Sequence, residues 1–291
     1  MHYPIWVCEM NVIKRKGDSM LSSHFQNNYQ GIASFLPFTA ELESIEQQQI
    51  NQTYDIYADH LQKRELALCY LQNTRGLSDD IINLFQLGFA DKSVCEQFRD
   101  IDNPEAFRGM LKRTGAISPK GHHIFMGSVI IPIKRDDNVV GGVGRRISDV
   151  VRHTSTPYPF HLIDEEALFN ADCLAGQPNC VVLCKSPMEA LIALGQGIEE
   201  VISLVGNVDF TEAHAKLLKS HNVKLVKVAF NQSSYYLQKL SAIAQVLKRY
   251  RIRCKVVDLT DWQDINALCL YDPSGKLLHQ RIRQAQFYGG H

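Results

Sequence analysis

Between Ala213 and Val257 the chain contains no Asp or Glu. The same stretch holds ten basic residues: Lys216, Lys219, Lys224, Lys227, Lys239, Lys248, Arg249, Arg251, Arg253 and Lys255. Over the full chain, 31 basic and 31 acidic residues cancel, which argues against a histone-like binder. A strongly basic stretch within a neutral chain shows that charge is sorted into blocks. The acid-free block predicts a surface for a polyanion, and a set of solvated helix faces is the alternative interpretation.

Two further absences exclude other classes of protein. None of the eight cysteines forms a Cys-x-x-Cys pair, so a zinc ribbon has no support, and their scatter fits a reducing compartment. No apolar run approaches the ~20 residues that a membrane-spanning helix needs. The basic cluster at residues 14–16 follows the first apolar run, the reverse of a signal peptide. We therefore expect a cytoplasmic protein with no membrane partner.

The first half of the chain predicts helices followed by a β-hairpin. A long amphipathic helix is expected over 39–71, closed by Arg75-Gly76. Ser78 and Asn103-Pro104 are typical helix starts, the second helix of the two ending near Gly115. Two apolar runs, 128–133 and 139–143, flank the short polar turn 136–138, which is the pattern of a hairpin.

From residue 179 onward the pattern alternates between strands and helices. Strands are expected at 181–184, 201–205, 225–230 and 255–259, with helices at 186–197, 211–220 and 234–250. Repeated units of this kind predict an α/β fold with a parallel sheet covered by helices. The expected organisation is an N-terminal arm (1–39), a helical plus β-hairpin subdomain (40–175), an α/β domain (176–262) and a C-terminal basic tail (263–291).

In such folds the chemistry lies at the carboxyl ends of the strands. Lys185 follows one predicted strand, and Asn231 and Ser233 follow another. A magnesium site needs oxygen ligands, chiefly carboxylates, and these positions supply none. The nearest candidate acids are Glu189 and Asp264, which are too few for a two-metal centre.

Three segments, in this order, resemble the catalytic core of DnaG-type bacterial primases. The first is YLQNTRGLS at 70–78 with LGFA at 87–90, and the second is the hairpin IPIKRDDNVVGGVGR at 131–145. The third is the strand and helix layout of 181–259, which is similar to a TOPRIM domain, the metal-binding α/β domain of primases. The resemblance covers about residues 50–265 and implies a TOPRIM-like parallel sheet preceded by a helical and hairpin subdomain of primase type.

The departures from the family lie at its metal site. The resemblance implies Glu at the first strand end and Asp-x-Asp at the second, where this chain has Lys185, Asn231 and Ser233. No counterpart of the family's zinc-binding module is expected either. The metal motifs are therefore degenerate, and we expect no catalytic residue, no metal and no cofactor, with Mg²⁺ required only if Glu189 and Asp264 form a rearranged site. Lys185 is interpreted as a phosphate-binding residue, the alternative being a drifted residue on an inactive surface.

The resemblance also implies that the hairpin subdomain lines a groove for single-stranded template. The candidate nucleic-acid contacts are Lys112, Arg113, Lys120, Lys134, Arg135, Arg145, Arg146, Lys185 and Lys227. The glycines of 141–144 either let the backbone approach a ligand or form a bulged hairpin. Phe125, Tyr158 and Phe160 either stack on bases or fill the core, and the second interpretation is preferred.

These features predict a primase-like nucleic-acid-binding protein of DNA replication, of mobile-element or phage type, which is inactive in primer synthesis. The expected partner is single-stranded DNA or a primer–template. One alternative is an active metal-dependent primase with a rearranged site. Another is a protein-interaction module that docks on or inhibits a helicase or an active primase through the acidic segments 41–59 and 79–105.

Overall fold

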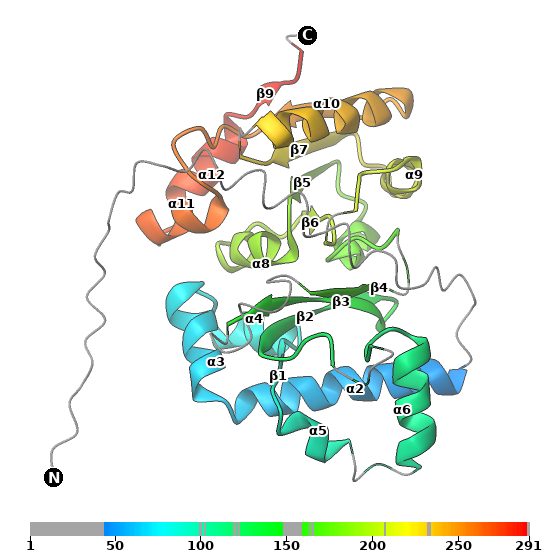
Figure 1. Cartoon of the computed structure of the whole chain (residues 1–291). Helices are drawn as coiled ribbons and strands as arrows, with labels where there is room; N and C mark the ends of the chain where they lie inside the picture. The colour runs from blue at the N-terminus through cyan, green and yellow to red at the C-terminus, as the bar shows by residue number, and fades with distance from the viewer. Residues whose placement is uncertain are drawn as a thin grey trace, which may run out of the picture. The chain divides into compact units, whose positions relative to one another are not determined.

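The computed structural model describes residues 44–98, 101, 103–118, 121, 123–147, 159–162, 164, 166–206, 208–231 and 234–289. Among the predicted features, the N-terminal arm 1–39, Lys120, Tyr158 and Ser233 lie outside the described residues. The elements of the described chain form two sheets, each with its own helices (Figure 1). No helix of this described part is long and apolar enough to cross a bilayer.

The N-terminal helices begin with α2 (Ser44–Gln62), α3 (Glu65–Cys69) and the π-helix η1 (Tyr70–Thr74). One continuous helix over 39–71 was the expectation, and the structure breaks it at Lys63-Arg64. Arg64 has φ −124° and ψ 87°, and its guanidinium lies 3.1 Å from the Asp91 carboxylate, an ion pair that fits this non-helical bend. The break lets α3 and η1 follow a direction different from that of α2.

The next elements are α4 (Asp79–Leu84), β1 (Gly88–Ala90), α5 (Val94–Gln97) and α6 (Pro104–Arg113). The Ser78 hydroxyl accepts a hydrogen bond from the Ile81 amide, and the Asn103 side chain accepts one from the Ala106 amide. Both predicted helix starts are therefore confirmed as N-caps. Gly76, expected to close the first helical run, has φ +67°, a conformation that glycine adopts without strain.

The first sheet is antiparallel, in the order β1-β2-β3-β4. The predicted hairpin consists of β2 (Ser128–Arg135) and β3 (Asn138–Arg146), and β4 is Phe160–Leu162. Asp136 and Asp137 at its turn have φ 49° and 62°, positive as a two-residue type I′ turn requires. The register shifts between Ile133 and Lys134, so the hairpin is bulged.

The hairpin glycines make room for neighbouring side chains of the same subdomain. A Cβ at Gly142 would lie 2.7 Å from the Tyr54 ring, and one at Gly144 would lie 2.8 Å from the Phe125 ring. Phe125 is fully buried in the cluster that joins α2, α6 and β2. Core packing therefore accounts for Gly142, Gly144 and Phe125.

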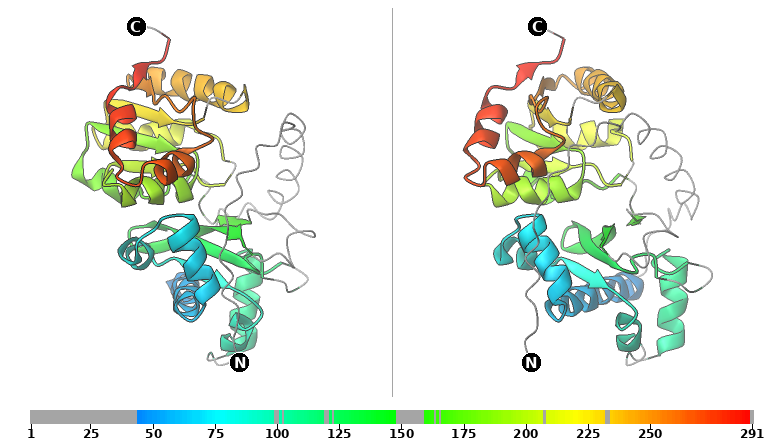
Figure 2. Two further views of the ribbon diagram at one scale, coloured as in Figure 1. Left: turned by 90° about the vertical axis from the view of Figure 1, so that its left-hand side faces the viewer. Right: turned by 60° about the vertical axis from the view of Figure 1, so that its left-hand side comes forward.

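The second sheet has the order β6-β5-β7-β8-β9. Its first four strands are parallel, as predicted: β5 (Cys180–Cys184), β6 (Val201–Ser203), β7 (Leu225–Ala229) and β8 (Arg253–Val256). On one face, α9 (Glu212–Ser220) and α10 (Ser234–Arg249) bury a cluster that includes Val226 and Val228. On the other face lie α8 (Pro187–Gly195), α11 (Ile265–Tyr271) and α12 (Lys276–Arg283), as Figure 2 shows.

The C-terminal segment differs from the basic tail that we expected over 263–291. It forms α11, α12 and β9 (Gln286–Phe287), and β9 pairs antiparallel with β8 at the edge of the sheet. Ile265 and Leu268 of α11, and Leu278 and Ile282 of α12, are buried. Their spacing of three and four residues is that of amphipathic helices, so the α/β domain continues past residue 262.

A single hydrophobic cluster joins the two sheets. It contains Leu71 of η1 and Ile131 of β2 together with Val182 of β5 and Leu191 of α8. The short 3-10 helix η2 (Ala171–Gly176) connects the hairpin subdomain to the parallel sheet. The ends of the parallel strands are therefore held against the helical subdomain by a continuous apolar core.

Candidate nucleic-acid interface

The residues that follow β5 form a nearly buried ion pair. The Lys185 ammonium lies 2.8 Å from the Glu189 carboxylate, and the two side chains are only 17% and 6% exposed. The N-cap Ser186 and then Pro187 start α8, so Glu189 falls in the first turn of this helix, four residues after Lys185. The Lys185 charge that could contact a phosphate is thus already engaged with a carboxylate in the first turn of α8.

Burial and charge act on Glu189 in opposite directions. Burial raises the pKa of Glu189 to about 7, while the neighbouring Lys185 ammonium lowers it. Charges from two other elements also act on the pKa of this carboxyl, Asp264 raising it and Arg75 lowering it. The charges of Lys185, Asp264 and Arg75 therefore all act on the Glu189 carboxyl.

Each of the other residues at this position has a structural partner. The Asp264 carboxylate accepts a hydrogen bond of 2.8 Å from the Ala267 amide and caps α11. The Asn231 amide follows β7, beside β5, and donates a 2.8 Å hydrogen bond to the Gln263 carbonyl oxygen. Asn231 and Asp264 thereby fix the loop that leads into α11.

Arg75 is a site residue that we did not single out from the sequence. Its Nε donates a 2.8 Å hydrogen bond to the Tyr70 hydroxyl, and its guanidinium lies 5.2 Å from the centre of the Tyr70 ring. The π-helix η1 carries Tyr70 and directly precedes Arg75. Its position within the RGLS segment was the available signal.

The donor set at the strand ends does not fit a magnesium ion. Its two carboxylates, Glu189 and Asp264, are engaged with an ammonium and with a helix amide, and Mg²⁺ demands an octahedral set of oxygens. Within the described ranges, no group of three or more His, Cys, Asp or Glu side chains is placed to hold a metal. The Lys185 ammonium, while protonated, cannot act as a metal ligand either.

The predicted basic residues of the hairpin subdomain fall into two groups. Lys112 and Arg113 are exposed on α6, where Arg113 pairs with Glu46 of α2. At the hairpin tip, Lys134 donates to the Gln86 side chain and Arg135 pairs with Asp164. These four side chains lie at the surface, although three of them already have a polar partner there.

Arg146, which we expected to contact nucleic acid together with Arg145, is buried. It is 6% exposed, and burial lowers the pKa of its guanidinium. Successive residues of a strand point to opposite faces, so Arg145 and Arg146 cannot both face solvent on one side of the sheet. Arg146 is therefore part of the interior of the hairpin subdomain.

The acid-free block 213–257 does not form one continuous basic surface. Lys239 of α10 pairs with Asp209 at 3.1 Å, and Arg249 pairs with Glu212 at 3.0 Å. Helices α9 and α10 cover one face of the sheet, whereas Lys227 lies in the central strand β7 and points to the other face. The block is thus divided between two faces, and acids from outside the block neutralise part of it.

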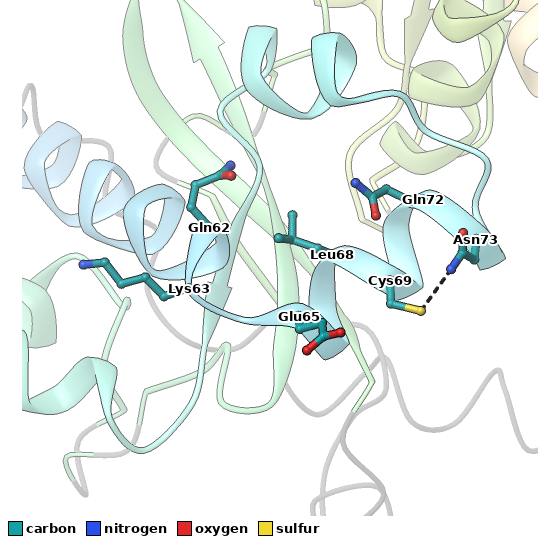
Figure 3. A pocket seen from close by; sticks show the side chains of 7 residues that line it. All are labelled: Gln62, Lys63, Glu65, Leu68, Cys69, Gln72 and Asn73. Atoms are coloured by element: carbon teal, nitrogen blue, oxygen red, sulfur yellow. Dashed lines mark hydrogen bonds between the residues drawn. The ribbon is translucent and has the colours of Figure 1, made fainter. Parts of the chain in front are cut away.

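A depression of about 450 Å³ lies over the end of α2, α3 and η1 (Figure 3). The Asn73 amide donates a 3.1 Å hydrogen bond to the exposed Cys69 thiol at its edge. The remaining side chains around it are Gln62, Lys63, Glu65, Leu68 and Gln72. Nothing in the sequence pointed to this depression.

The helical and hairpin subdomain and the parallel sheet together have the fold of the bacterial primase catalytic core. Residues 56–158 match the family described as the N-terminal domain of the DNA primase catalytic core. The α/β fold class and the primase resemblance are thereby confirmed.

Three solved structures illustrate the likeness. The Aquifex aeolicus primase, comprising zinc-binding and RNA polymerase domains, has a TM-score of 0.70 at 20% identity over 85% of this chain. The E. coli primase catalytic core has a TM-score of 0.69 at 21% identity, covering 84% of this chain and 81% of that one. A DnaG catalytic domain bound to single-stranded DNA has a TM-score of 0.69 at 19% identity, covering 84% and 81%.

The solved structures and the curated sequences match this chain to different extents. The chain spans 64% of the Aquifex aeolicus chain that it matches. No curated protein sequence matches the chain. The similarity therefore defines the fold, and the activity has to be argued from the residues of this chain.

Proposed function

We propose that this chain is a primase-like protein of DNA replication, of mobile-element or phage type, that binds single-stranded nucleic acid without making primers. The Lys185–Glu189 ion pair at the strand end carries this proposal, because it places a cation where the resemblance implies a metal ligand. With a TOPRIM-like site of this composition, the positive charge at the strand ends comes from the protein. Nucleic-acid binding then needs no Mg²⁺.

The surface basic residues supply the affinity in this proposal. Lys112, Arg113, Lys134 and Arg135 are the predicted contacts that lie at the surface of the hairpin subdomain. Arg113 and Arg135 exchange their carboxylate partners for phosphate groups when the strand binds. A relative of the same fold has been solved with single-stranded DNA bound, which supports the choice of ligand.

The test is a titration of a fluorescent oligo-dT with the full chain at several salt concentrations, with and without Mg²⁺. We expect binding that weakens steeply between about 50 and 200 mM salt and does not respond to Mg²⁺. The variant K112Q/R113Q should lower the affinity and the salt dependence together. Primer synthesis that requires Mg²⁺ or Mn²⁺ and disappears in Glu189→Ala would support the rearranged active site and overturn the proposal.

A restored metal site provides a second, independent measurement. The triple variant K185E/N231D/S233D recreates the acids that the resemblance implies. We expect Mg²⁺ to raise the melting temperature of this variant and to leave that of the unaltered chain unchanged. An equal response of both proteins to Mg²⁺ would show that the unaltered chain already holds a metal.

A further inference from the structure

On the face opposite α9 and α10, part of which is covered by α8, α11 and α12, a row of side chains runs from the buried Val182 toward the edge strand β9. In register, Val182 of β5 lies beside Lys227 of β7, Lys227 beside Lys255 of β8, and Lys255 beside Phe287 of β9. Residues paired across neighbouring strands point to the same face. Arg253 lies two residues before Lys255 on β8, and so also shares that face, about 6.6 Å along the strand.

Of the three cations of this row, Arg253 is exposed, and Lys227 and Lys255 are half-buried. Among the described residues, Lys227, Arg253 and Lys255 form no ion pair. Lys227 and Lys255 are direct neighbours on adjacent strands, an arrangement that like charges disfavour. An anion bound across the two strands would offset this repulsion.

An exposed aromatic ring completes the surface. Phe287 is 40% exposed, with the Lys255 ammonium 4.5 Å and the Arg253 guanidinium 5.9 Å from the ring centre. The adjacent Tyr288 is exposed to the same extent. Cations beside exposed aromatic rings are the combination that holds single-stranded nucleic acid, since phosphates meet the cations and bases stack on the rings.

We infer that the sheet face formed by Lys227, Arg253, Lys255 and Phe287 is a second contact for single-stranded nucleic acid, separate from the strand ends at Lys185. The inference rests on the proposed function for its ligand class, and it adds a site on another part of the molecule. An acidic peptide would neutralise the cations but would not use the exposed Phe287 ring. The exposed ring favours a ligand that can stack.

The chain offers a matched control for a binding test. Lys216 and Lys219 of α9 are exposed on the opposite side of the sheet, so K216Q/K219Q removes the same charge as K227Q/K255Q. The probe is a fluorescent oligo-dT of about 15 nucleotides, within the site sizes known for single-strand binders. We expect K227Q/K255Q to weaken binding at least tenfold more than K216Q/K219Q does. Its slope of log affinity against log salt should fall by about 1.4, two phosphate contacts' worth.

Two surface variants keep the test independent of folding, because Arg253 and Phe287 are exposed. R253Q and F287L should each weaken oligo-dT binding by about fivefold to tenfold while the melting temperature stays within one degree or so of the unaltered chain. A polyglutamate peptide of equal charge should compete poorly.

The outcomes separate this inference from the proposed function. If the unaltered chain binds oligo-dT and none of these variants differs from K216Q/K219Q, the second contact is wrong and the proposed function stands. If the unaltered chain does not bind oligo-dT, both are wrong. Equal competition by polyglutamate would assign the surface to an acidic protein partner and overturn the nucleic-acid assignment.

Discussion

The surroundings of the two sheets bury ionisable groups of opposite kinds. Around the antiparallel sheet, burial lowers the pKa of His123 and of His161 to about 4. At the parallel sheet, burial raises the pKa of Glu189 to about 7 beside Lys185. The first region therefore keeps its buried bases neutral and uses them for packing, whereas the second retains a charge pair at the place where the resemblance implies catalysis. Glu189 and these two histidines should therefore respond to pH in opposite directions.

The largest expected effect is on the pH dependence of stability. His123 and His161 have folded pKa values below the ordinary 6.5, so their stabilising contribution is present above about pH 6.5 and is lost as the pH falls toward 4. For each histidine, the free energy of unfolding falls by roughly 1.4 kcal/mol per pH unit as the pH is lowered through that window. Glu189 acts oppositely, since its folded pKa exceeds the ordinary 4.5 and its burial costs stability as the pH rises from there to about 7. Two histidines outweigh one carboxyl, so the free energy of unfolding should fall on acidification.

Urea unfolding at about pH 6.5 and pH 4.5 measures this balance. Glu189→Gln removes the opposing contribution, so the loss of stability on acidification should be steeper in this variant than in the unaltered chain. His161→Gln should make it shallower. A flat profile in all three proteins would show that the histidines titrate normally and that the two regions do not differ.

The next effect concerns the ion pair itself. Lys185→Met leaves Glu189 buried without its partner, and we expect a loss of about 3 kcal/mol in the free energy of unfolding near pH 7. The loss should shrink near pH 5, because protonating the Glu189 carboxyl there costs less. In K185M/E189L both charges are replaced by apolar groups, and the stability should return close to that of the unaltered chain. A double variant as unstable as K185M would show that the lysine acts through packing and not through the carboxylate.

The elements that the sequence predicted are those with strong local signals. Ser78, Asn103 and Ser186 are caps whose side chains bond to the next turn, and the hairpin turn has residues that tolerate a positive φ. Helix α11 was missed because its apolar face is short, and the Lys and Arg residues of α12 suggested a solvated tail. The break at Lys63-Arg64 coincides with a contact to Asp91, a distant residue that periodicity does not register.

The sequence predicted which residues lie at the candidate site, but it did not predict which of them contact one another. That Lys185 and Glu189 lie four residues apart at a helix start was readable, but their mutual burial depends on the packing of α8 against α11 and η1. Arg146 was misplaced because charge alone does not reveal which face of a strand is buried. Arg75 reaches the site through the π-helix, a deviation from helical periodicity that apolar spacing does not predict.

A smaller effect tests whether the hairpin glycines serve packing. Gly142→Ala places a Cβ against the Tyr54 ring, and we expect a loss of about 2 kcal/mol in the free energy of unfolding. Gly176→Ala is the control, since a Cβ there meets no atom within 4 Å and should change stability by no more than about 0.5 kcal/mol. If G142A folds with unchanged stability and loses oligo-dT binding, the glycine serves a ligand and the packing interpretation is wrong.

The smallest expected effect compares Lys185, which pairs with Glu189, with Lys227, which forms no ion pair among the described residues. Lys227→Gln removes the like-charge contact with Lys255 while the contact of Lys255 with Phe287 is retained. Stability at low salt should therefore rise by about 0.5 kcal/mol, and the gain should disappear at about 1 M salt, where the screening length is near 3 Å. Lys219→Gln, on the far side of the sheet, should show no such gain. Lys185→Met is expected to destabilise the fold, and Lys227→Gln is expected to stabilise it. The sign of the change in the free energy of unfolding therefore distinguishes a lysine that stabilises the fold from one whose charge is available to an anion. A loss of stability in K227Q at low salt would place Lys227 in the first group and remove the electrostatic reason for a ligand on this face.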